Sequence, residues 1–296
     1  MDARHNPRTH MTVSRHPRLL DLLNRQETLF IPGCYDALSA RLAELAGFKL
    51  AYVGSYATAA SGFALPDVGA LTLDDLSRHA KTVTDAVGVP VIADAEGGFF
   101  APANIWRTIH AFEDAGVSAI HIEDHAGGKH TNLPQELISL EDMVQRLKAA
   151  LDARRDPNFQ IIARTDAIWA KGDVDEAIRR LRAFSELGIE LVFPTGATPK
   201  MLRTIRSEVP GCRIVVIDLP EINQVSEWNG LADLVINYGF CLYAASKGVR
   251  DALAEFNSHQ SVPKLNNLLE DPGQFEQRLG YDTFTARSIQ YQARSK

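Results

Sequence analysis

Short apolar runs recur along the chain, and longer amphipathic segments separate them. Each run is too short for a helix and lacks the apolar–polar alternation of a half-exposed strand. Runs of this kind are typical of strands covered on both faces, as in a parallel sheet. We therefore predict strands at Leu29–Pro32, Leu50–Gly54, Pro90–Ala93, Ala119–Ile122, Gln160–Ala163, Leu191–Pro194, Ile214–Ile217 and Leu234–Asn237.

The segments between these runs predict helices. In the first of them, Leu38, Leu42 and Leu45 share one face. Another begins with Thr72 followed three residues later by Asp75, a variant of the capping box that starts many helices. The predicted helices are Asp36–Ala46, Thr72–Val87, Ser139–Arg154 and Val174–Leu187.

Strand–helix units in this order favour one closed (β/α)8 TIM barrel over two domains. A doubly wound open sheet is the alternative, but no GxGxxG motif follows the first strand. We assign residues 1–18 to a disordered N-terminal arm, residues 19–262 to the barrel and residues 263–296 to a C-terminal helical extension.

Composition narrows the class of protein. The chain is 45% hydrophobic and 23% charged, as in ordinary soluble proteins. Its net charge of −6 argues against a nucleic-acid binder, and no stretch reaches the roughly 20 apolar residues of a membrane span. The three cysteines, Cys34, Cys212 and Cys241, predict neither a zinc site nor a disulfide framework and fit reduced thiols in the cytoplasm.

Charged and small residues follow several predicted strands. Catalytic groups of a barrel lie at the carboxyl ends of its strands, so these residues predict an active site there. Ordinary loops would place one or two acids at these positions. The residues are Gly54-Ser55, Asp94-Ala95-Glu96, Glu123-Asp124, Arg164-Thr165-Asp166 and Asp218.

Three of these acids predict a metal site. The spacing of Asp94 and Glu96 places both carboxylates on the same side of the strand end, and Glu123 ends the next strand. Converging carboxylates repel one another unless a cation lies among them, and oxygen ligands suit Mg²⁺. The alternative is that each acid caps a helix or pairs with Arg or Lys.

Two further features predict substrate contacts. Arg164 is suited to bind a carboxylate or phosphonate, although a structural ion pair with Asp94 or Glu123 is the alternative. The Gly54-Ser55 turn can present backbone N–H groups to an oxyanion.

A polar loop follows Glu123 and contains paired glycines. We interpret it as a lid over the barrel mouth that excludes water and delivers acid or base groups, with a solvated loop as the alternative. Its candidate groups are Lys129, His130, Thr131 and Asn132.

Several segments together resemble the isocitrate lyase/phosphoenolpyruvate mutase superfamily. They are Pro32–Ala40, Leu65–Asp67, Asp94–Phe99, Ile122–Asp124 and Ile161–Ala167. The resemblance implies a (β/α)8 barrel whose terminal helix is often exchanged between subunits, giving homodimers or homotetramers. It also implies Mg²⁺ or Mn²⁺ and an enolate-like intermediate of a 2-oxo or 2-hydroxy acid.

The same resemblance implies roles for individual residues. Asp94 and Glu96 match the metal motif, and Glu123 matches the acid that helps to hold the metal's waters. Asp67 matches an acid near the metal, and Arg164 matches a substrate-binding arginine. The remaining substrate contacts implied are Gly54, Ser55 and Tyr56.

Departures from the superfamily pattern point away from tricarboxylate cleavage by the usual lyase route. Thr131 stands where the lyases carry a proton-donating cysteine, and a hydroxyl is a poor acid near neutral pH. Thr195 and Ala244 stand where a glutamate and an arginine are found, and Glu96 replaces an aspartate. Lys129 fits the phosphonopyruvate-processing members.

The sequence thus predicts a metal-dependent lyase that breaks a C–C bond of a small 2-oxo or 2-hydroxy dicarboxylate. Lys129, His130 or Thr131 would close the lid and deliver a proton. One alternative is a phosphonopyruvate mutase or hydrolase in which Thr131 or Asn132 contacts the phosphoryl group. Another is a non-catalytic barrel that binds metabolites.

Overall fold

The structure is a computed structural model that describes residues 18–23, 27–220, 222 and 224–292. The predicted N-terminal arm, residues 1–18, therefore lies outside the described residues except for Arg18. The chain divides into two compact units, Met1–Leu242 and Tyr243–Lys296. The predicted barrel boundary at residue 262 stays a prediction.

Eight parallel strands form the first unit, in the order β1-β10-β9-β8-β7-β4-β3-β2. A bridge between Gly33 and Tyr52 joins the two ends of this order, so the sheet curls into a nearly closed barrel. All eight predicted strands are confirmed, and the doubly wound alternative is wrong. The strands are β1 (Leu29–Pro32), β2 (Ala51–Val53), β3 (Val91–Asp94), β4 (Ala119–Glu123), β7 (Gln160–Thr165), β8 (Leu191–Pro194), β9 (Arg213–Ile217) and β10 (Leu234–Asn237).

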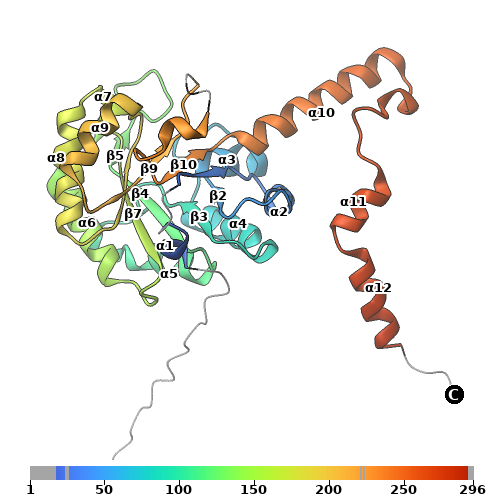
Figure 1. The fold of residues 1–296 in the computed structure, drawn as a ribbon, viewed down its shortest axis with the longest axis horizontal. Helices are drawn as coiled ribbons and strands as arrows, with labels where there is room; N and C mark the ends of the chain where they lie inside the picture. Colours follow the sequence, from blue (N-terminus) through green and yellow to red (C-terminus); the bar gives the residue numbers. More distant parts are fainter. Residues whose placement is uncertain (1–17, 24–26, 221, 223, 293–296) are drawn as a thin grey trace, which may run out of the picture. The chain divides into compact units, whose positions relative to one another are not determined.

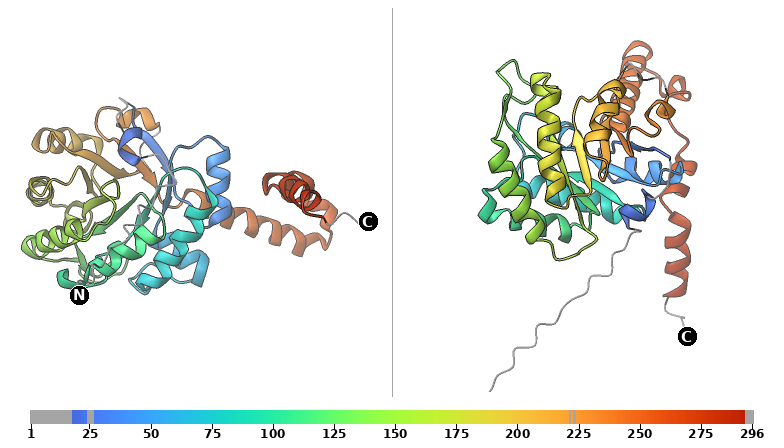
Figure 2. Two further views of the ribbon diagram at one scale, coloured as in Figure 1. Left: turned by 90° about the horizontal axis from the view of Figure 1, so that it is seen from below. Right: turned by 60° about the vertical axis from the view of Figure 1, so that its left-hand side comes forward.

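Helices lie outside the strands (Figure 1), and two further views show the same arrangement (Figure 2). The connection from β9 to β10 carries only the 3₁₀ helix η2 (Val225–Trp228) in its described part. The helices of this unit are α1 (Leu19–Leu22), α2 (Ala37–Leu45), α3 (Ser55–Phe63), α4 (Leu73–Ala86), α5 (Trp106–Asp114), α6 (Leu140–Asp152), α7 (Ala167–Lys171), α8 (Val174–Glu186) and α9 (Pro199–Glu208), with the 3₁₀ helix η1 (Pro102–Asn104) before α5.

The second unit contains most of α10 (Phe240–His259), which begins in the first. It continues with the 3₁₀ helix η3 (Val262–Leu265), α11 (Pro272–Arg278) and α12 (Tyr281–Gln290). None of the residues of α10 is buried, and apolar side chains such as Leu253 and Phe284 are exposed. Exchange of a terminal helix between subunits stays a prediction.

Two apolar cores flank the strands. The inner core fills the barrel and includes Leu19 of α1, Ile92, Ile162 and Leu234. The outer core lies between strands and helices and includes Phe112 and Phe184. Strands buried on both faces explain why the sequence shows continuous apolar runs there.

The packing face of α2 differs from the pattern in the sequence. Leu42 and Leu45, which share a face with Leu38, are 42% and 53% exposed. The buried residues of α2 are instead the small Ser39, Ala40 and Ala43. Small side chains allow close packing against neighbouring elements, so helical period alone misplaced the buried face.

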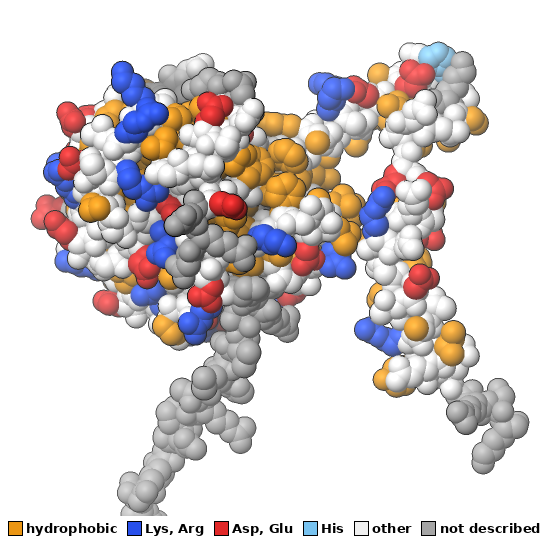
Figure 3. Space-filling model, viewed as in Figure 1, with side chains coloured by type: hydrophobic (Ala, Val, Ile, Leu, Met, Phe, Trp, Pro, Cys, Tyr) orange, Lys and Arg blue, Asp and Glu red, His pale blue; other side chains and the backbone are white. Residues whose placement is uncertain are grey.

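Helix capping follows the sequence more closely. The Thr72 hydroxyl accepts a hydrogen bond from the Asp75 amide, and the Asp75 side chain accepts one from the Thr72 amide. The predicted capping box is therefore confirmed. On the face seen in Figure 3, cationic and anionic side chains are interspersed over the barrel unit. Among the described helices, none is long and apolar enough to cross a membrane.

The cap gives a stability prediction. We expect Thr72→Ala to lower the free energy of unfolding by about 1 kcal/mol, because amides in the first turn of α4 lose their acceptor. Thr82→Ala is the matched control, since Thr82 is exposed inside the same helix. Denaturant titrations of the three proteins would measure the effect, and equal midpoints for wild type and Thr72→Ala would contradict it.

Candidate active site

Inward-facing residues of four neighbouring strands form the base of the site. Side chains two residues apart on a strand share a face, so β4 directs Ala119, His121 and Glu123 inward in succession. The first belongs to the apolar inner core, and the other two are buried polar groups. In register across the sheet, Asp94 lies opposite His121, and Glu123 lies opposite Arg164.

Lys129 links the acids at this rim. Its Nζ lies 2.8 Å from Glu96 Oε2, 3.1 Å from Glu123 Oε1 and 3.6 Å from Asp67 Oδ2. The side chain is only 9% exposed, although it comes from the predicted lid. One ammonium group therefore ties the lid to acids from three separate segments.

Asp94 is held by groups from the start of α3 and from the residue after Ala95. The Ser55 hydroxyl donates to Asp94 Oδ2 at 2.8 Å, with the Ser55 amide 3.3 Å away, and the Glu96 amide donates to Oδ1 at 2.8 Å. In this structure Ser55 therefore gives its donors to Asp94 and orients that carboxylate. Donation from the Gly54-Ser55 turn to a substrate oxyanion stays a prediction.

Glu96 reaches the site by a route that strand alternation does not give. β3 ends at Asp94, and Glu96 has a left-handed backbone with φ of 49°. Such a conformation is uncommon for a residue other than glycine and clusters at functional sites. Alternation along a strand therefore does not account for the position of Glu96, although its carboxylate lies in the same cluster as that of Asp94.

Arg164 pairs with two carboxylates. Its Nε and Nη2 donate to the two oxygens of Asp166 at 2.8 and 3.1 Å, and Nη1 lies 2.9 Å from Glu123 Oε2. His125 Nδ1 lies 3.1 Å from Asp166 Oδ2. The ion pair with Glu123 that the sequence left as an alternative is present, and the donors of Nη1 face the acid cluster.

A second buried ion pair supports this arrangement from behind. Asp124 accepts a hydrogen bond from the Asp166 amide at 2.9 Å and another from Arg180 Nη1 at 2.9 Å. Asp124, Asp166 and Arg180 are all buried. Removing one member of a buried pair leaves an uncompensated charge, so loss of Asp124 or Arg180 would be costly.

His121, which the sequence did not single out, also faces Asp94. Its Nδ1 lies 3.6 Å from Asp94 Oδ1, and its Nε2 lies 3.0 Å from the Tyr52 hydroxyl. Burial lowers the pKa of His121 to about 4, so its imidazole is neutral at neutral pH. Burial also raises the pKa of Tyr52 well above its usual value, which leaves a phenolic proton to donate to Nε2.

The acids differ in their ionisation. Burial raises the pKa of Glu123 to about 8, even though Arg164 and Lys129 oppose the shift. Burial acts in the same direction on Asp94, but His121, Lys129 and Arg164 together hold the pKa of Asp94 below its usual range. Burial works against the charge of Lys129, yet Glu123, Asp94 and Glu96 raise its pKa well above the usual value.

These residues fit a divalent metal. Asp94, His121 and Glu123 each offer one ligand atom, and these atoms lie within 4.8 Å of one another. Glu96 Oε1 is buried without a hydrogen-bond partner among the described residues. A buried carboxylate oxygen of that kind is costly unless a cation or an ordered water meets it, and carboxylate oxygens suit Mg²⁺.

The predicted lid contains regular secondary structure and is not only a polar loop. Residues 125–137 include two short antiparallel strands, β5 (His125–Gly127) and β6 (Glu136–Leu137). Gly128 has φ of 81°, and a Cβ at this position would lie 2.4 Å from the Pro134 carbonyl oxygen, so a side chain does not fit there. Lys129 follows this turn directly and reaches down into the acid cluster.

His130 lies in an aromatic setting above Asp67. Its Nε2 is 3.4 Å from Asp67 Oδ2. The rings of Trp169 and Tyr56 lie 5.1 and 6.1 Å from its ring, and Tyr56 also contacts Tyr238 edge to face. The structure thus brings Asp67, Tyr56 and His130, all singled out in the sequence, to one side of the cluster.

Thr131 and Asn132 lie on the exposed part of the lid, away from the acid cluster. Both are exposed, and the Thr131 hydroxyl donates to the Gly128 carbonyl at 2.8 Å within the lid. It also accepts the Leu133 amide at 3.1 Å. This conformation does not bring these two side chains to the acids.

Sequence reasoning missed several residues of the site. Strand period points to His121, because it precedes Glu123 by two residues on the same strand. Asp166 was noticed as a charged strand end but received no role. His125 and Trp169, whose rings lie 5.4 Å apart, gave no signal beyond their positions after strands.

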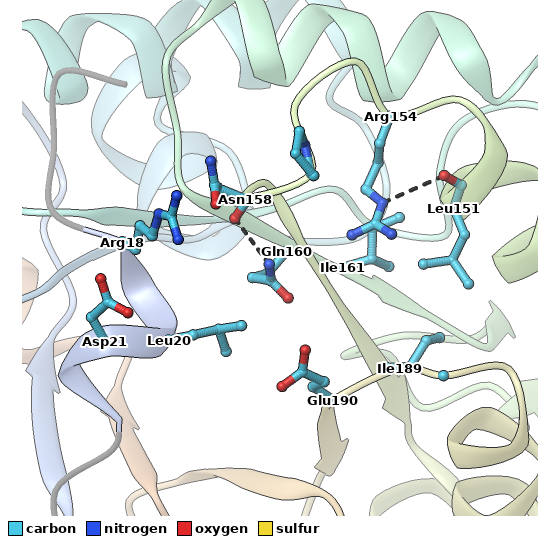
Figure 4. Close-up of a pocket in the computed structure, with 12 residues that line it drawn as sticks. Arg18, Leu20, Asp21, Leu151, Arg154, Asn158, Gln160, Ile161, Ile189 and Glu190 are labelled. Atoms are coloured by element: carbon cyan, nitrogen blue, oxygen red, sulfur yellow. Dashed lines mark hydrogen bonds between the residues drawn. The ribbon is translucent and has the colours of Figure 1, made fainter. Parts of the chain in front are cut away.

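A separate polar pocket of about 240 Å³ lies at the opposite, amino-terminal end of the strands (Figure 4). Arg18 and Asp21 line it from the start of the first helix, and Gln160 and Glu190 from the starts of β7 and β8. Chemistry in barrels belongs to the other end, so this pocket is not the candidate active site.

A parallel barrel with buried acids and cations at the carboxyl ends of its strands has the architecture of a (β/α)8 enzyme. Comparison with known proteins shows to which family of barrels the chain belongs. The family model described as phosphoenolpyruvate phosphomutase matches residues 19–257, and the chain belongs to this family.

Characterised relatives carry lyase names. The 2,3-dimethylmalate lyase of Eubacterium barkeri is 38% identical over 199 residues, which cover 66% of this chain and 68% of that enzyme. The 2-methylisocitrate lyase of Escherichia coli strain K12 is 40% identical over 179 residues, or 60% of each chain and thus less than two thirds of that enzyme. A probable 2-methylisocitrate lyase of Corynebacterium glutamicum is 31% identical over 263 residues, covering 86% of this chain and 85% of its own length.

Solved structures agree on the fold. A phosphoenolpyruvate phosphomutase from Streptomyces platensis subsp. rosaceus has a TM-score of 0.85 at 28% identity, covering 93% of this chain and 98% of its own. An oxaloacetate acetylhydrolase with bound 3,3-difluorooxalacetate has a TM-score of 0.84 at 26% identity, covering 93% and 96%. The family therefore includes barrels named for different reactions.

The metal site gives a binding prediction. We expect Asp94→Asn to weaken Mn²⁺ binding by at least about 100-fold, more than the loss of a supporting residue costs. Asp218→Asn is the matched control, because Asp218 follows β9 at the same rim and pairs with Asn237 instead. Titration calorimetry would measure both affinities. Equal Mn²⁺ affinity of wild type and Asp94→Asn would show that the metal, if it binds, binds elsewhere.

Proposed function

We propose that this chain is a divalent-metal-dependent lyase that cleaves a C–C bond of a small 2-oxo or 2-hydroxy dicarboxylate through an enolate. One observation carries the proposal: the carboxylates of Asp94 and Glu123, which are buried, and of Glu96, which is partly buried, converge beside Lys129 and the guanidinium of Arg164. The lyase names of the relatives favour C–C over P–C chemistry. The 2,3-dimethylmalate in the name of one relative supports a small dicarboxylate as the substrate class.

The metal we propose is Mg²⁺ or Mn²⁺, held by Asp94, Glu96 and Glu123, with His121 as a neighbour that either orients Asp94 or adds a ligand. When bound, it supplies a Lewis acid for the negative charge that develops when the bond breaks. The protein supports this with fixed geometry, since Ser55 and the Glu96 amide hold Asp94 in place.

Arg164 binds the substrate carboxylate in this proposal. Two of its donors are fixed by Asp166, which sets the plane of the guanidinium and leaves Nη1 toward the acid cluster. A rigid, oriented guanidinium binds a carboxylate with little loss of freedom. Tyr56, which contacts His130, and Ser55, which contacts Asp94, are further substrate contacts in this proposal.

The lid residues have different roles in this proposal. Lys129 closes the lid, because its ammonium contacts Glu96 and Glu123 and would release them only with charge compensation from the metal. His130 delivers the proton that the enolate carbon requires after C–C cleavage. Two observations support this role: His130 contacts Asp67, and its ring lies between those of Tyr56 and Trp169. Thr131, bonded within the lid, is the weaker candidate.

We further propose that the enzyme is a cytoplasmic homo-oligomer, a dimer or tetramer. Exposed apolar side chains on α2, including Leu42 and Leu45, support an interface between subunits. Cysteines that are free in the structure fit a reducing compartment.

A substrate panel tests the reaction. We expect turnover of at least one of the dicarboxylates oxaloacetate and 2,3-dimethylmalate with Mg²⁺ or Mn²⁺, and slower or no turnover of the tricarboxylate 2-methylisocitrate. Chelation or Asp94→Asn should reduce kcat/KM by roughly a thousandfold, the equivalent of several kcal/mol of charge stabilisation. Turnover of phosphonopyruvate alone would replace the lyase by the P–C alternative. Metal-dependent binding across the panel without turnover would support the non-catalytic barrel.

Lid substitutions test the proton donor. We expect His130→Gln to lower kcat by about 100-fold or more, in the range of a lost general acid, with KM little changed. Thr131→Val is the matched control in the adjacent position and should retain kcat within about threefold, since its hydroxyl serves only the lid. Steady-state kinetics on the substrate that the panel identifies would measure both effects. A large loss in Thr131→Val with normal His130→Gln activity would reverse the assignment.

A further inference from the structure

Two of the three cysteines, far apart in the sequence, lie just beyond the paired first and last strands of the barrel. Cys34 follows β1, and Cys241 lies in the first turn of α10 after β10. β1 and β10 are the first and last strands of the barrel and pair with each other from Leu29–Leu234 to Pro32–Asn237. The backbone continues this pairing beyond the strands toward both cysteines.

Backbone hydrogen bonds fix the two segments side by side. The Gly33 amide donates to the Asn237 carbonyl at 2.8 Å, and the Cys241 amide donates to the Gly33 carbonyl at 3.1 Å. A Cβ on Gly33 would lie 2.2 Å from the Tyr238 carbonyl oxygen, so only glycine permits this close approach. The Cys34 amide donates to Tyr52 on the other side at 2.8 Å.

The two thiols themselves interact. They lie close enough for each to shift the pKa of the other, and Cys241 packs against the outer core to which Cys34 belongs. The Cys34 thiol donates to the Pro32 carbonyl at 3.5 Å. Cys34 is fully buried, whereas Cys241 is half-buried and therefore open to small solutes. Cys212, by contrast, is buried and its thiol contacts the Ile189 carbonyl.

The environment makes the two thiols unequal. Interaction with the Cys34 thiol lowers the pKa of Cys241, although burial opposes this shift. The same interaction, together with burial, raises the pKa of Cys34. The thiolate is the reactive form of cysteine, so the half-buried Cys241 is the one that reacts first.

We propose that Cys34 and Cys241 form a peroxide-sensitive dithiol site whose oxidation to a disulfide covalently links the ends of the first and last strands. The Cys241 thiolate attacks one oxygen of hydrogen peroxide, the O–O bond breaks, and the products are a sulfenic acid and, after protonation, water. The Cys34 sulfur then attacks the Cys241 sulfur and displaces its hydroxyl, while the Cys34 proton leaves with it as a second water. Two thiols are oxidised, and one peroxide is reduced to two waters.

A disulfide here would stabilise the fold more than most. It encloses nearly the whole barrel in one loop, and long loops lose the most freedom when they are closed in the unfolded chain. The bridge would act on the barrel seam, which otherwise depends on backbone hydrogen bonds and packing. The site is independent of the metal cluster and of the proposed reaction.

Peroxide treatment of the full chain tests the site. After oxidation and alkylation, non-reducing peptide mapping should find the peptides of Cys34 and Cys241 linked and two hydrogens lighter, with Cys212 alkylated. The thermal midpoint should rise by roughly 5–10 °C and return with dithiothreitol. Cys212→Ser should behave like wild type, whereas Cys241→Ser and Cys34→Ala should show neither the link nor the shift.

Three results would overturn the proposal. One is oxidation of Cys241 to sulfinic or sulfonic acid while Cys34 remains a free thiol. Another is a disulfide between the Cys241 residues of two chains. The third is a link between Cys34 and Cys241 that leaves the thermal midpoint unchanged, which would remove its role in closing the barrel.

Discussion

Burying several carboxylates at one end of a barrel requires cations among them, and the structure meets this requirement with Lys129 and Arg164. Lys129 contacts Asp67, Glu96 and Glu123, and Arg164 contacts Glu123 and Asp166. Isolated buried charges are too costly to persist, so the acids and the two cations depend on one another. Burial still raises the pKa of Glu123 to about 8, so the two cations do not fully compensate the cluster. A divalent metal would complete the compensation.

The strand register determines which groups meet. Asp94 opposite His121 and Glu123 opposite Arg164 are consequences of parallel pairing, and the inner apolar core below them keeps that pairing fixed. The lid adds Lys129 and His130 from a segment that is tied to the rim by ion pairs. One half of the site thus belongs to the barrel strands, and the other half to the lid. A lid that opened would suit an enzyme that must admit a substrate and then exclude water.

The sequence predicted the strands and the positions of the rim acids well, because both follow from local patterns. Apolar runs reveal strands covered on both sides, and parallel strands bring their carboxyl ends together. Features that depend on backbone conformation or on residues distant in the sequence were not predicted. The left-handed turn at Glu96, the burial of Ala40 and Ala43 in place of Leu42 and Leu45, and the inward reach of Lys129 are of this kind. His121 was accessible from strand period but was interpreted only as part of an apolar run. The meeting of Cys34 and Cys241 depends on barrel closure, which no local pattern contains.

The central claim is that the cluster of Asp94, Glu96 and Glu123 holds the metal that the reaction needs. Diffraction from crystals grown with Mn²⁺ and oxalate, an enolate mimic, tests it most directly through the anomalous signal of the metal. The account predicts a single strong peak within about 2.5 Å of an Asp94 carboxylate oxygen, with oxalate between the metal and Arg164 and with Lys129 displaced from at least one acid. A cluster with no anomalous peak, Lys129 still bound to Glu96 and Glu123, and Mn²⁺ at another place would contradict it.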